Sequence, residues 1–405
     1  MNNLTQPLRT MRSYFALPPA AKAAHKVDRA GLPDDDAGVD LAVEECLGWL
    51  CRAQDNSKYK DGGVARHYSL LTGWGASYPE TTGYIVPTML AAAVVTKNGD
   101  YRSRAARMLD WLASIQLEGG GFQGGLIDSE PVVPVTFNTG QILLGLAAGV
   151  KEFGDRYRPA MRGAADCLVK TQDPDGCWRQ MPTPFAAPGE KAYETHVAWG
   201  LLEAARLDPD RGYAEAALAN INWALEKQRK NGWFESCCLS YPSVPLTHTL
   251  GYVLRGILEG YLFFRDEALL EASVTTADGL LKTLNHENGF LPGRIDSDWR
   301  GVVPWVCLTG SAQVAYCWLK LHQITGDESY REAGLTANKY VRRTLKIDGP
   351  PDTRGGIKGS FPIHTGYDGR YFGGYGTFQY LNWAAKFFID ANLLEGEIRG
   401  NIDAQ

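Results

Sequence analysis

The chain has 405 residues, of which 44% are hydrophobic and 21% charged, and its formal net charge is −5. This composition is typical of a globular protein with a sizeable core, and the acidic balance without a Lys/Arg-rich run excludes duplex nucleic acid as an expected partner. No apolar run approaches the ~20 residues that span a bilayer, the N-terminus has no secretory signal, and the eight cysteines contain no C-x-x-C pair. We therefore expect a cytoplasmic protein with reduced thiols.

A repeat of about 56 residues follows an N-terminal arm, which we assign to residues 1–38. Each clear copy contains a glutamine, three intervening residues, a glycine and then a large apolar residue. The copies begin at Gln116, Gln172 and Gln228, and a degenerate copy begins at Asn285. Internal repeats of this length are typical of stacked or closed helical architectures.

A threonine opens each of six apolar runs: Thr82, Thr139, Thr195, Thr249, Thr309 and Thr377. Threonine is a favoured N-cap residue, and runs that are apolar on nearly all faces predict buried inner helices. Amphipathic segments between these runs predict outer helices at 40–52, 101–115, 157–171, 213–227, 267–284 and 329–345. The sequence thus predicts an all-α fold, a single (α/α)6 toroid of six helical hairpins over residues 39–395, with a tail at 396–405.

The predicted connections differ strongly in length. Links from inner to outer helices are short, whereas links from outer to inner helices are long and rich in Gly, Pro and aromatic residues. All long loops should therefore lie on one rim, together with the inner-helix N-termini, which carry partial positive charge. We expect the largest pocket at this rim, lined by Glu80, Asn138, Glu194 and His248, with Arg66 and Arg294 nearby.

Polar residues at the start of the predicted inner helices form the candidate site. We expect His248, Tyr252, Glu194 and Glu80 to be catalytic, with His248 as the proton-transfer residue because imidazole can act as a base near neutral pH. The expected substrate-binding residues are Arg66, His67, Tyr84, Asn138, Gln141, Arg179, His196, Tyr241, Arg294, Arg300 and Trp305. Arg370 and Tyr371 lie in the last long loop and could join them. Aromatic rings can stack on sugars, and arginines can bind carboxylates with paired hydrogen bonds.

Three strings in the chain resemble a poorly characterised bacterial family associated with polysaccharide biosynthesis. They are YPETTGYIVPTM at 78–89, GGIKGSFPIH at 355–364 and NWAAKFFIDAN at 382–392. Some members of that family carry the label δ-aminolevulinate dehydratase, an activity of a β/α barrel that the helical pattern here argues against. The glutamine–glycine–aromatic repeat also resembles terpenoid-cyclase toroids, and the hairpin number resembles six-hairpin glycosidases, polysaccharide lyases and the helical domain of glucuronyl C5-epimerases.

These observations favour a carbohydrate-active enzyme that acts on an acidic, uronate-containing glycan by proton abstraction, as an epimerase or a lyase. The alternatives are an inverting glycoside hydrolase using Glu80 and Glu194, a non-catalytic glycan-binding or scaffold toroid, and a terpenoid-cyclase-like enzyme. The chain lacks a D-x-D-D acid, a D-D-x-x-D diphosphate site and any familiar zinc motif, so we expect no metal and no cofactor. The oligomeric state stays open.

Overall fold

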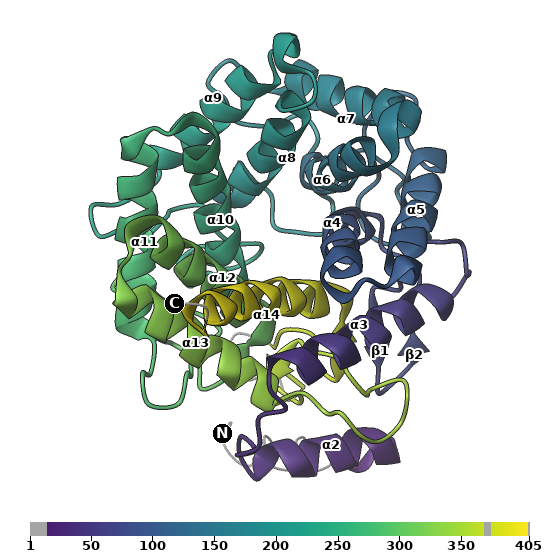
Figure 1. Ribbon diagram of the computed structural model, residues 1–405, viewed down its shortest axis with the longest axis vertical. Helices are drawn as coiled ribbons and strands as arrows, with labels where there is room; N and C mark the ends of the chain where they lie inside the picture. The colour runs from purple at the N-terminus through teal and green to yellow at the C-terminus, as the bar shows by residue number, and fades with distance from the viewer. Residues whose placement is uncertain (1–13, 368–373, 404–405) are drawn as a thin grey trace, which may run out of the picture.

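A closed ring of helical hairpins forms the protein (Figure 1). The computed structural model describes residues 14–367 and 374–403. The inner helices are α4 (Pro79–Thr96), α6 (Thr136–Phe153), α8 (Thr195–Ala205), α10 (Thr247–Phe264), α12 (Leu308–Thr325) and α14 (Asn382–Asp403). The outer helices are α3 (Val39–Asp55), α5 (Gly99–Ser114), α7 (Arg158–Thr171), α9 (Tyr213–Leu225), α11 (Glu267–Thr283) and α13 (Glu328–Arg343). The predicted (α/α)6 toroid is therefore confirmed.

The remaining elements are short. Helix α2 (Pro19–Arg29) lies outside the ring, and three 3-10 turns, η1 (Gly154–Tyr157), η2 (Ala192–Glu194) and η3 (Pro209–Arg211), sit between helices. Strands β1 (His67–Ser69), β2 (Gly73–Trp74) and β5 (Gln379–Leu381) form one antiparallel sheet in the order β2-β1-β5, and β3 (Val306–Cys307) pairs with β4 (Ser360–Phe361). Because β1 belongs to the first hairpin and β5 to the last, their pairing closes the ring. No helix in the described part of the chain is long and apolar enough to cross a bilayer.

The repeated glutamines join neighbouring hairpins. The side-chain amide of Gln116 donates to the carbonyls of Gly120, in its own loop, and Ala160, on the next outer helix, at 2.8 and 2.9 Å. Gln172 repeats this pattern with Gly176 and Ala216. The motif is therefore a structural tie between adjacent hairpins, and it carries no chemistry of its own.

Five of the six repeated threonines lie within the inner helices and do not cap them, so the N-cap interpretation is wrong. Helices α4 and α6 begin three residues before Thr82 and Thr139. The Thr139 hydroxyl donates to the carbonyl of Val135 and accepts from the amide of Phe122, which fixes the preceding loop to the first helical turn. Thr82 does the same with Tyr78 and Val64.

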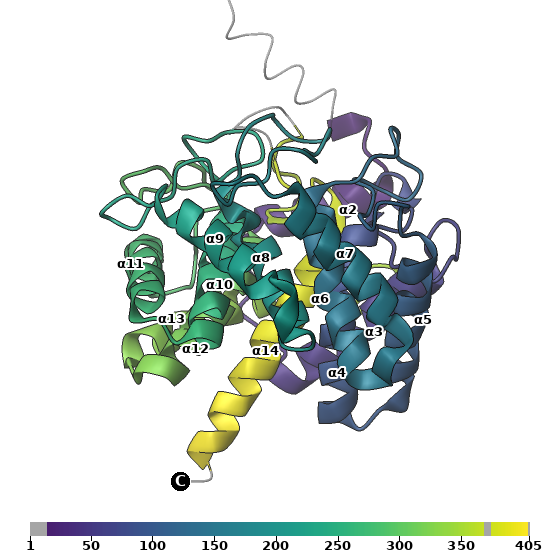
Figure 2. The same cartoon turned by 90° about the horizontal axis from the view of Figure 1, so that it is seen from above.

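The sixth inner helix begins later than the sequence predicts. Thr377 lies in a loop, and α14 starts only at Asn382 because residues 379–381 are extended in β5 and pair with β1. The helix then continues through residues 396–403, the segment assigned to a tail. Figure 2 shows α14 projecting from one end of the barrel, while the long loops gather at the opposite end.

The N-terminal arm is partly helical and is fixed to the barrel. The carboxylate of Asp28 on α2 forms a buried ion pair with Lys358 at 2.6 Å and accepts the amide hydrogen of Ile363 at 2.8 Å. Both charged side chains are almost fully buried, at 2% and 3% exposure. Helix α2 therefore holds the loop that leads to the last inner helix.

Candidate active site

Two cavities lie at opposite ends of the barrel. The rim cavity, of about 360 Å³, opens among the long loops, and the basal cavity, of about 1040 Å³, opens at the end of the short links, beside Thr96 and Asn98. The expectation that the largest pocket lies at the long-loop rim is therefore wrong. Aromatic side chains fill much of the rim end, whereas residues of mixed size, from Ala91 to Trp199, line the base.

The rim cavity contains a buried carboxyl group. Glu80 lies in the first turn of α4, is 8% exposed, and accepts a hydrogen bond from the Tyr78 hydroxyl at 2.8 Å. Burial raises the pKa of Glu80 to about 7, although the Tyr78 hydrogen bond and the charge of Arg66 oppose this shift. A carboxyl group with a pKa near neutrality can donate or accept a proton at physiological pH.

Arg66 supplies positive charge to the same cavity. Its guanidinium contacts His67 Nδ1 at 3.1 Å and Gln379 Oε1 at 3.2 Å, and it lies 4.8 Å from the ring centroid of Trp383. Arg66 lines the cavity but forms no ion pair with any described residue. An arginine held by neutral partners keeps its charge available for an anionic ligand.

Aromatic side chains form most of the remaining wall. They are Tyr78, Tyr84, Phe137, Phe185, Tyr193, Tyr252, Tyr375 and Trp383. The Trp383 indole donates to the Tyr375 hydroxyl at 2.7 Å, which ties α14 to the preceding loop. Apolar faces combined with a few polar groups are typical of small-ligand sites, and the volume lies within the usual range for them.

His248 and Tyr252 share one wall, with ring centroids 4.4 Å apart. His248 Nδ1 faces Gln313 Oε1 at 3.1 Å, so Nδ1 carries the hydrogen and Nε2 keeps its lone pair. Burial lowers the pKa of His248 to about 3 and raises that of Tyr252 well above 10. Both groups are therefore neutral near pH 7, and both are weak bases there.

Six residues predicted for the site line the rim cavity: Arg66, Glu80, Tyr84, Asn138, His248 and Tyr252. The side-chain nitrogen of Asn138 has no partner among the described residues, so it can donate to a ligand. The structure thus places together a carboxyl, a guanidinium, an amide, an imidazole and two phenols.

Glu194 is not among the residues that line the rim cavity; Tyr193 is. The chain forms the 3-10 turn η2 at this point, and Tyr193 lines the cavity at the repeat position that Phe137 occupies in the preceding hairpin. Burial raises the pKa of Glu194 to about 8, and one of its oxygens has no hydrogen-bond partner among the described residues.

Four further predicted residues lie just behind the cavity or beside Arg66. His196 Nδ1 contacts Gln141 Oε1 at 2.6 Å, and the imidazole packs against the Tyr252 ring at 4.6 Å between centroids. Both side chains are fully buried. His67 lies next to Arg66, and burial together with that charge lowers its pKa to about 4. Trp305 is a core residue that packs with Leu246 and Cys307.

The other predicted binding residues do not line the rim cavity. Arg179 pairs with Asp173, Asp175 and Glu190, and Arg300 is a surface residue beside Asp298. Arg294 is buried, donates to the Val244 carbonyl at 2.9 Å and lies against the Tyr241 ring. The structure leaves Arg370 and Tyr371 outside its described residues.

Sequence reasoning missed Phe137, Tyr193, Tyr375 and Trp383 as site residues. Phe137 and Tyr193 directly precede the polar residues that the repeat alignment selected, so counting one position earlier in each copy would have found them. Tyr375 and Trp383 flank the late start of α14 and carry no repeat signal. No three His, Cys, Asp or Glu side chains within the described ranges are grouped so that they could hold a metal ion.

Comparisons with known proteins find similarity in structure and none in sequence. No family model matches the chain, and no curated protein is similar to it in sequence. An unsaturated glucuronyl hydrolase specific for heparin has a TM-score of 0.69 at 14% identity, covering 89% of this chain and 98% of that chain. The unsaturated glucuronyl hydrolase of Bacillus sp. GL1 has a TM-score of 0.67 at 16% identity, covering 88% and 96%. A D-mannose isomerase has a TM-score of 0.65 at 12% identity, covering 89% and 97%. At these identities the similarity establishes the shared toroid fold.

Proposed function

We propose that the protein is a carbohydrate-active hydrolase that removes a terminal uronate residue from a glycan, with Glu80 as the proton donor. The observation that carries this proposal is the buried Glu80 carboxyl, whose pKa is raised to about 7, beside an arginine without an ion-pair partner among the described residues. The carboxyl can give up a proton near neutral pH, and the arginine can hold the carboxylate of a uronate.

The protonation states of the side chains that line the rim cavity favour donation of a proton to the substrate over removal of a proton from it. Epimerases and lyases of uronates remove the hydrogen next to the carboxyl group, which requires an effective base. His248 has a pKa of about 3 and Tyr252 one well above 10, so neither group accepts a proton readily at pH 7. Glu80 is therefore the better-matched acid–base residue, and His248 serves to bind substrate hydroxyl groups.

The structural neighbours named unsaturated glucuronyl hydrolases suggest which uronate to test first. A uronate with a double bond next to its ring oxygen is an enol ether, and one proton donor is enough to start its hydrolysis. Glu80 would protonate the alkene carbon, water would add to the resulting oxocarbenium carbon, and the water's proton would return to the Glu80 carboxylate. The hemiketal formed in this way opens to a ketone by breaking the bond between that carbon and the ring oxygen, which leaves a hemiacetal at the anomeric carbon. The hemiacetal then collapses to an aldehyde, and the glycosidic oxygen leaves with a proton as the hydroxyl group of the second sugar. This route fits a cavity in which Glu80 is the one carboxyl group among the described lining residues.

The test is a panel of unsaturated and saturated uronate disaccharides incubated with purified protein in D2O and followed by NMR. We expect loss of the alkene signal and release of the second sugar. Glu80→Gln should lower turnover by roughly 10²-fold or more, and the wild-type rate should fall as pH rises through about 7, where the donor loses its proton. Turnover that Glu80→Gln leaves unchanged would refute the assignment of the donor.

A second candidate function is epimerisation or elimination through His248 and Tyr252, since both rings face the cavity from one helix. The same experiment separates it from hydrolysis. An epimerase would exchange the hydrogen next to the carboxyl group with deuterium without cleavage, and a lyase would create an alkene signal. Binding of the disaccharide without any chemical change would instead favour a glycan-binding toroid.

A further inference from the structure

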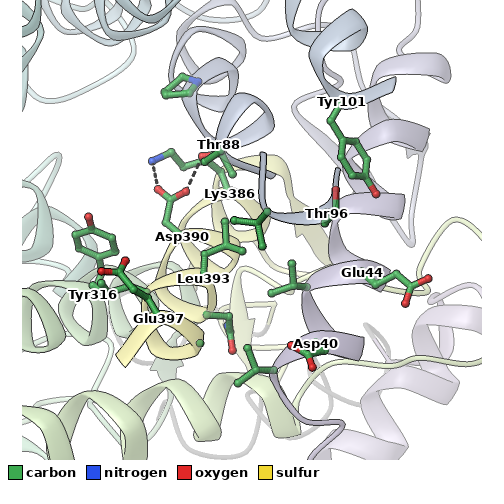
Figure 3. A pocket seen from close by; sticks show the side chains of 18 of the residues that line it. Asp40, Glu44, Thr88, Thr96, Tyr101, Tyr316, Lys386, Asp390, Leu393 and Glu397 are labelled. Carbon is green, nitrogen blue, oxygen red and sulfur yellow. Dashed lines mark hydrogen bonds and ion pairs between the residues drawn. The ribbon is translucent and has the colours of Figure 1, made fainter. Parts of the chain in front are cut away.

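The basal cavity lies at the opposite end of the barrel from the candidate active site and needs its own explanation. Its walls come from α3, α4, α10, α12 and α14, with one residue each from α5 and α8. Figure 3 shows it from close by, with the hydrogen-bonded group of Thr88, Lys386 and Asp390 near Leu393, and with Asp40 and Glu44 contributed by α3. None of these residues lines the rim cavity.

Arg255, on the α10 wall of this cavity, is held in one fixed orientation. Its guanidinium lies between the rings of Trp199 and Tyr316, at 4.4 and 3.9 Å from their centroids. Its Nε donates to Glu259 at 2.7 Å, and the side chain is 11% exposed. Stacking between two rings and one hydrogen bond together remove most of the freedom that an arginine normally has.

The two terminal nitrogens of Arg255 make no hydrogen bond within residues 14–367 and 374–403. They donate to no acceptor among the described residues, yet they are not sealed from the cavity that the residue lines. The terminal nitrogens of this charged, preoriented group are therefore open to the cavity. A buried donor is expected to be satisfied, and a planar guanidinium edge matches the two oxygens of a carboxylate or phosphate.

Lys320 brings a second available positive charge. Its ammonium group donates to Gln323 Oε1 at 2.7 Å and forms no ion pair with a described residue. Burial and the charge of Arg255 lower the pKa of Lys320, although Glu397 and Glu259 oppose the shift. Lys386, in contrast, is paired with Asp390 and is therefore already neutralised. Arg255 uses only its Nε in the ion pair with Glu259, and Lys320 has no ion-pair partner among the described residues, so this side of the cavity offers donors to an anion although Asp40, Glu44, Asp390 and Glu397 also line the cavity.

We propose that the basal cavity is a second ligand site, in which the Arg255 fork and Lys320 bind the oxyanion of a small acid. The head group is a carboxylate or a phosphate, which share the geometry that the fork recognises. The remaining wall carries Pro87, Ala91 and Leu393, which can receive an apolar part of the ligand. This site is independent of the proposed hydrolase activity, because it shares no lining residue with the rim cavity.

Titration of the purified full chain with inorganic phosphate, and separately with glucuronate, tests this proposal. Calorimetry measures affinity. A change in fluorescence that is lost in Trp199→Phe assigns the bound anion to the surroundings of Trp199, one of the 11 tryptophans and the one that stacks on Arg255. Arg255→Met should weaken binding about tenfold or more, and Arg255→Lys and Lys320→Met should also weaken it. Arg206→Met is the matched control, since Arg206 packs on Phe263 outside both cavities and should leave affinity unchanged.

The outcomes separate the two sites. Arg66→Met should leave binding detected at Trp199 intact, so loss of hydrolase activity alone does not affect this proposal. A response to phosphate but not to glucuronate would assign a phosphate ligand, and the reverse a sugar acid. If Arg255→Met folds and binds both anions as tightly as the wild type, or if the wild type binds neither, the proposal is wrong. Should Arg255→Met fail to fold, Arg255→Lys and Lys320→Met decide by the same criterion.

Discussion

Arg66 and Arg179 show how the surroundings of a residue decide its role. Both lie in long loops, and the sequence predicts both as substrate-binding residues. Arg179 is surrounded by Asp173, Asp175 and Glu190, with contacts between 2.5 and 3.0 Å. Arg66 has only neutral hydrogen-bond partners among the described residues. The two side chains have equal formal charge, but only the charge of Arg66 is available to a ligand.

This difference predicts opposite results for one substitution. Arg66→Met should weaken binding of a uronate disaccharide about tenfold or more, because a hydrogen-bonded charge pair is lost. Arg179→Met should leave binding unchanged, and it serves as the control for removal of an arginine from this rim. Calorimetry on both variants measures the effect. Equal affinity of Arg66→Met and wild type would place the ligand carboxylate elsewhere.

At the scale of elements, glycines set the distance between inner helices. A Cβ atom built on Gly83 of α4 would lie 2.4 Å from the Ile142 Cα of α6, and one on Gly145 would lie 2.2 Å from the Gly83 carbonyl oxygen. Neighbouring inner helices therefore touch backbone to backbone at this point. Because Glu80 and Asn138 are carried by these two helices, their spacing at the rim depends on this contact.

We expect Gly83→Ala to destabilise the protein by roughly 1–3 kcal/mol, since backbone atoms must move to admit the methyl group. Gly99→Ala is the matched control, because Gly99 begins helix α5 and has open space around it. Its free energy of unfolding should stay within about 0.5 kcal/mol of wild type. Chemical denaturation measures both values. A Gly83→Ala protein as stable as Gly99→Ala would show that the helices separate freely.

The elements were more predictable from the sequence than the site. Apolar runs and amphipathic segments depend on local residue patterns, so they locate the inner and outer helices to within a few residues. The repeat cannot reveal that β5 delays the start of α14, because its pairing with β1 joins opposite ends of the chain. It also does not show which of Tyr193 and Glu194 lines the cavity, because both lie at the start of the same helix.

At the scale of the whole molecule, the toroid buries both carboxyl groups and imidazoles. Glu80 and Glu194 are held so that the neutral carboxyl is favoured, and His67 and His248 so that the neutral imidazole is favoured. Burial is the first cause of all four shifts. Burial within the barrel thus opposes the charged form of each of these four groups. The pH dependence of folding reports this directly, without knowledge of the substrate.

The carboxyl groups and the histidines change the free energy of unfolding in opposite directions as pH rises. The pKa of a carboxyl is about 4.5 when unperturbed and about 7 and 8 in folded Glu80 and Glu194, so their stabilisation is complete below pH 4.5 and is lost as pH rises through 7 and 8. The histidine contribution is complete above pH 6.5 and is lost as pH falls toward 4 and 3. Between about pH 4.5 and 6.5 the two contributions change in opposite directions and offset each other, so for these four groups stability should be greatest over this range and fall above it and below it.

Between pH 6.5 and 8, only the carboxyl groups among these four residues still change their contribution. The free energy of unfolding should fall over this interval by up to roughly 1.4 kcal/mol per pH unit for each carboxyl. Glu194→Gln keeps a neutral polar side chain of similar shape and should flatten this decline, because the deprotonated form can no longer arise. Glu118→Gln removes an exposed carboxyl and should leave the decline as steep as in the wild type. Urea denaturation of the three proteins at pH 6.5, 7.25 and 8 measures the slopes, and a Glu194→Gln slope equal to that of Glu118→Gln would mean that Glu194 reaches solvent in the native state.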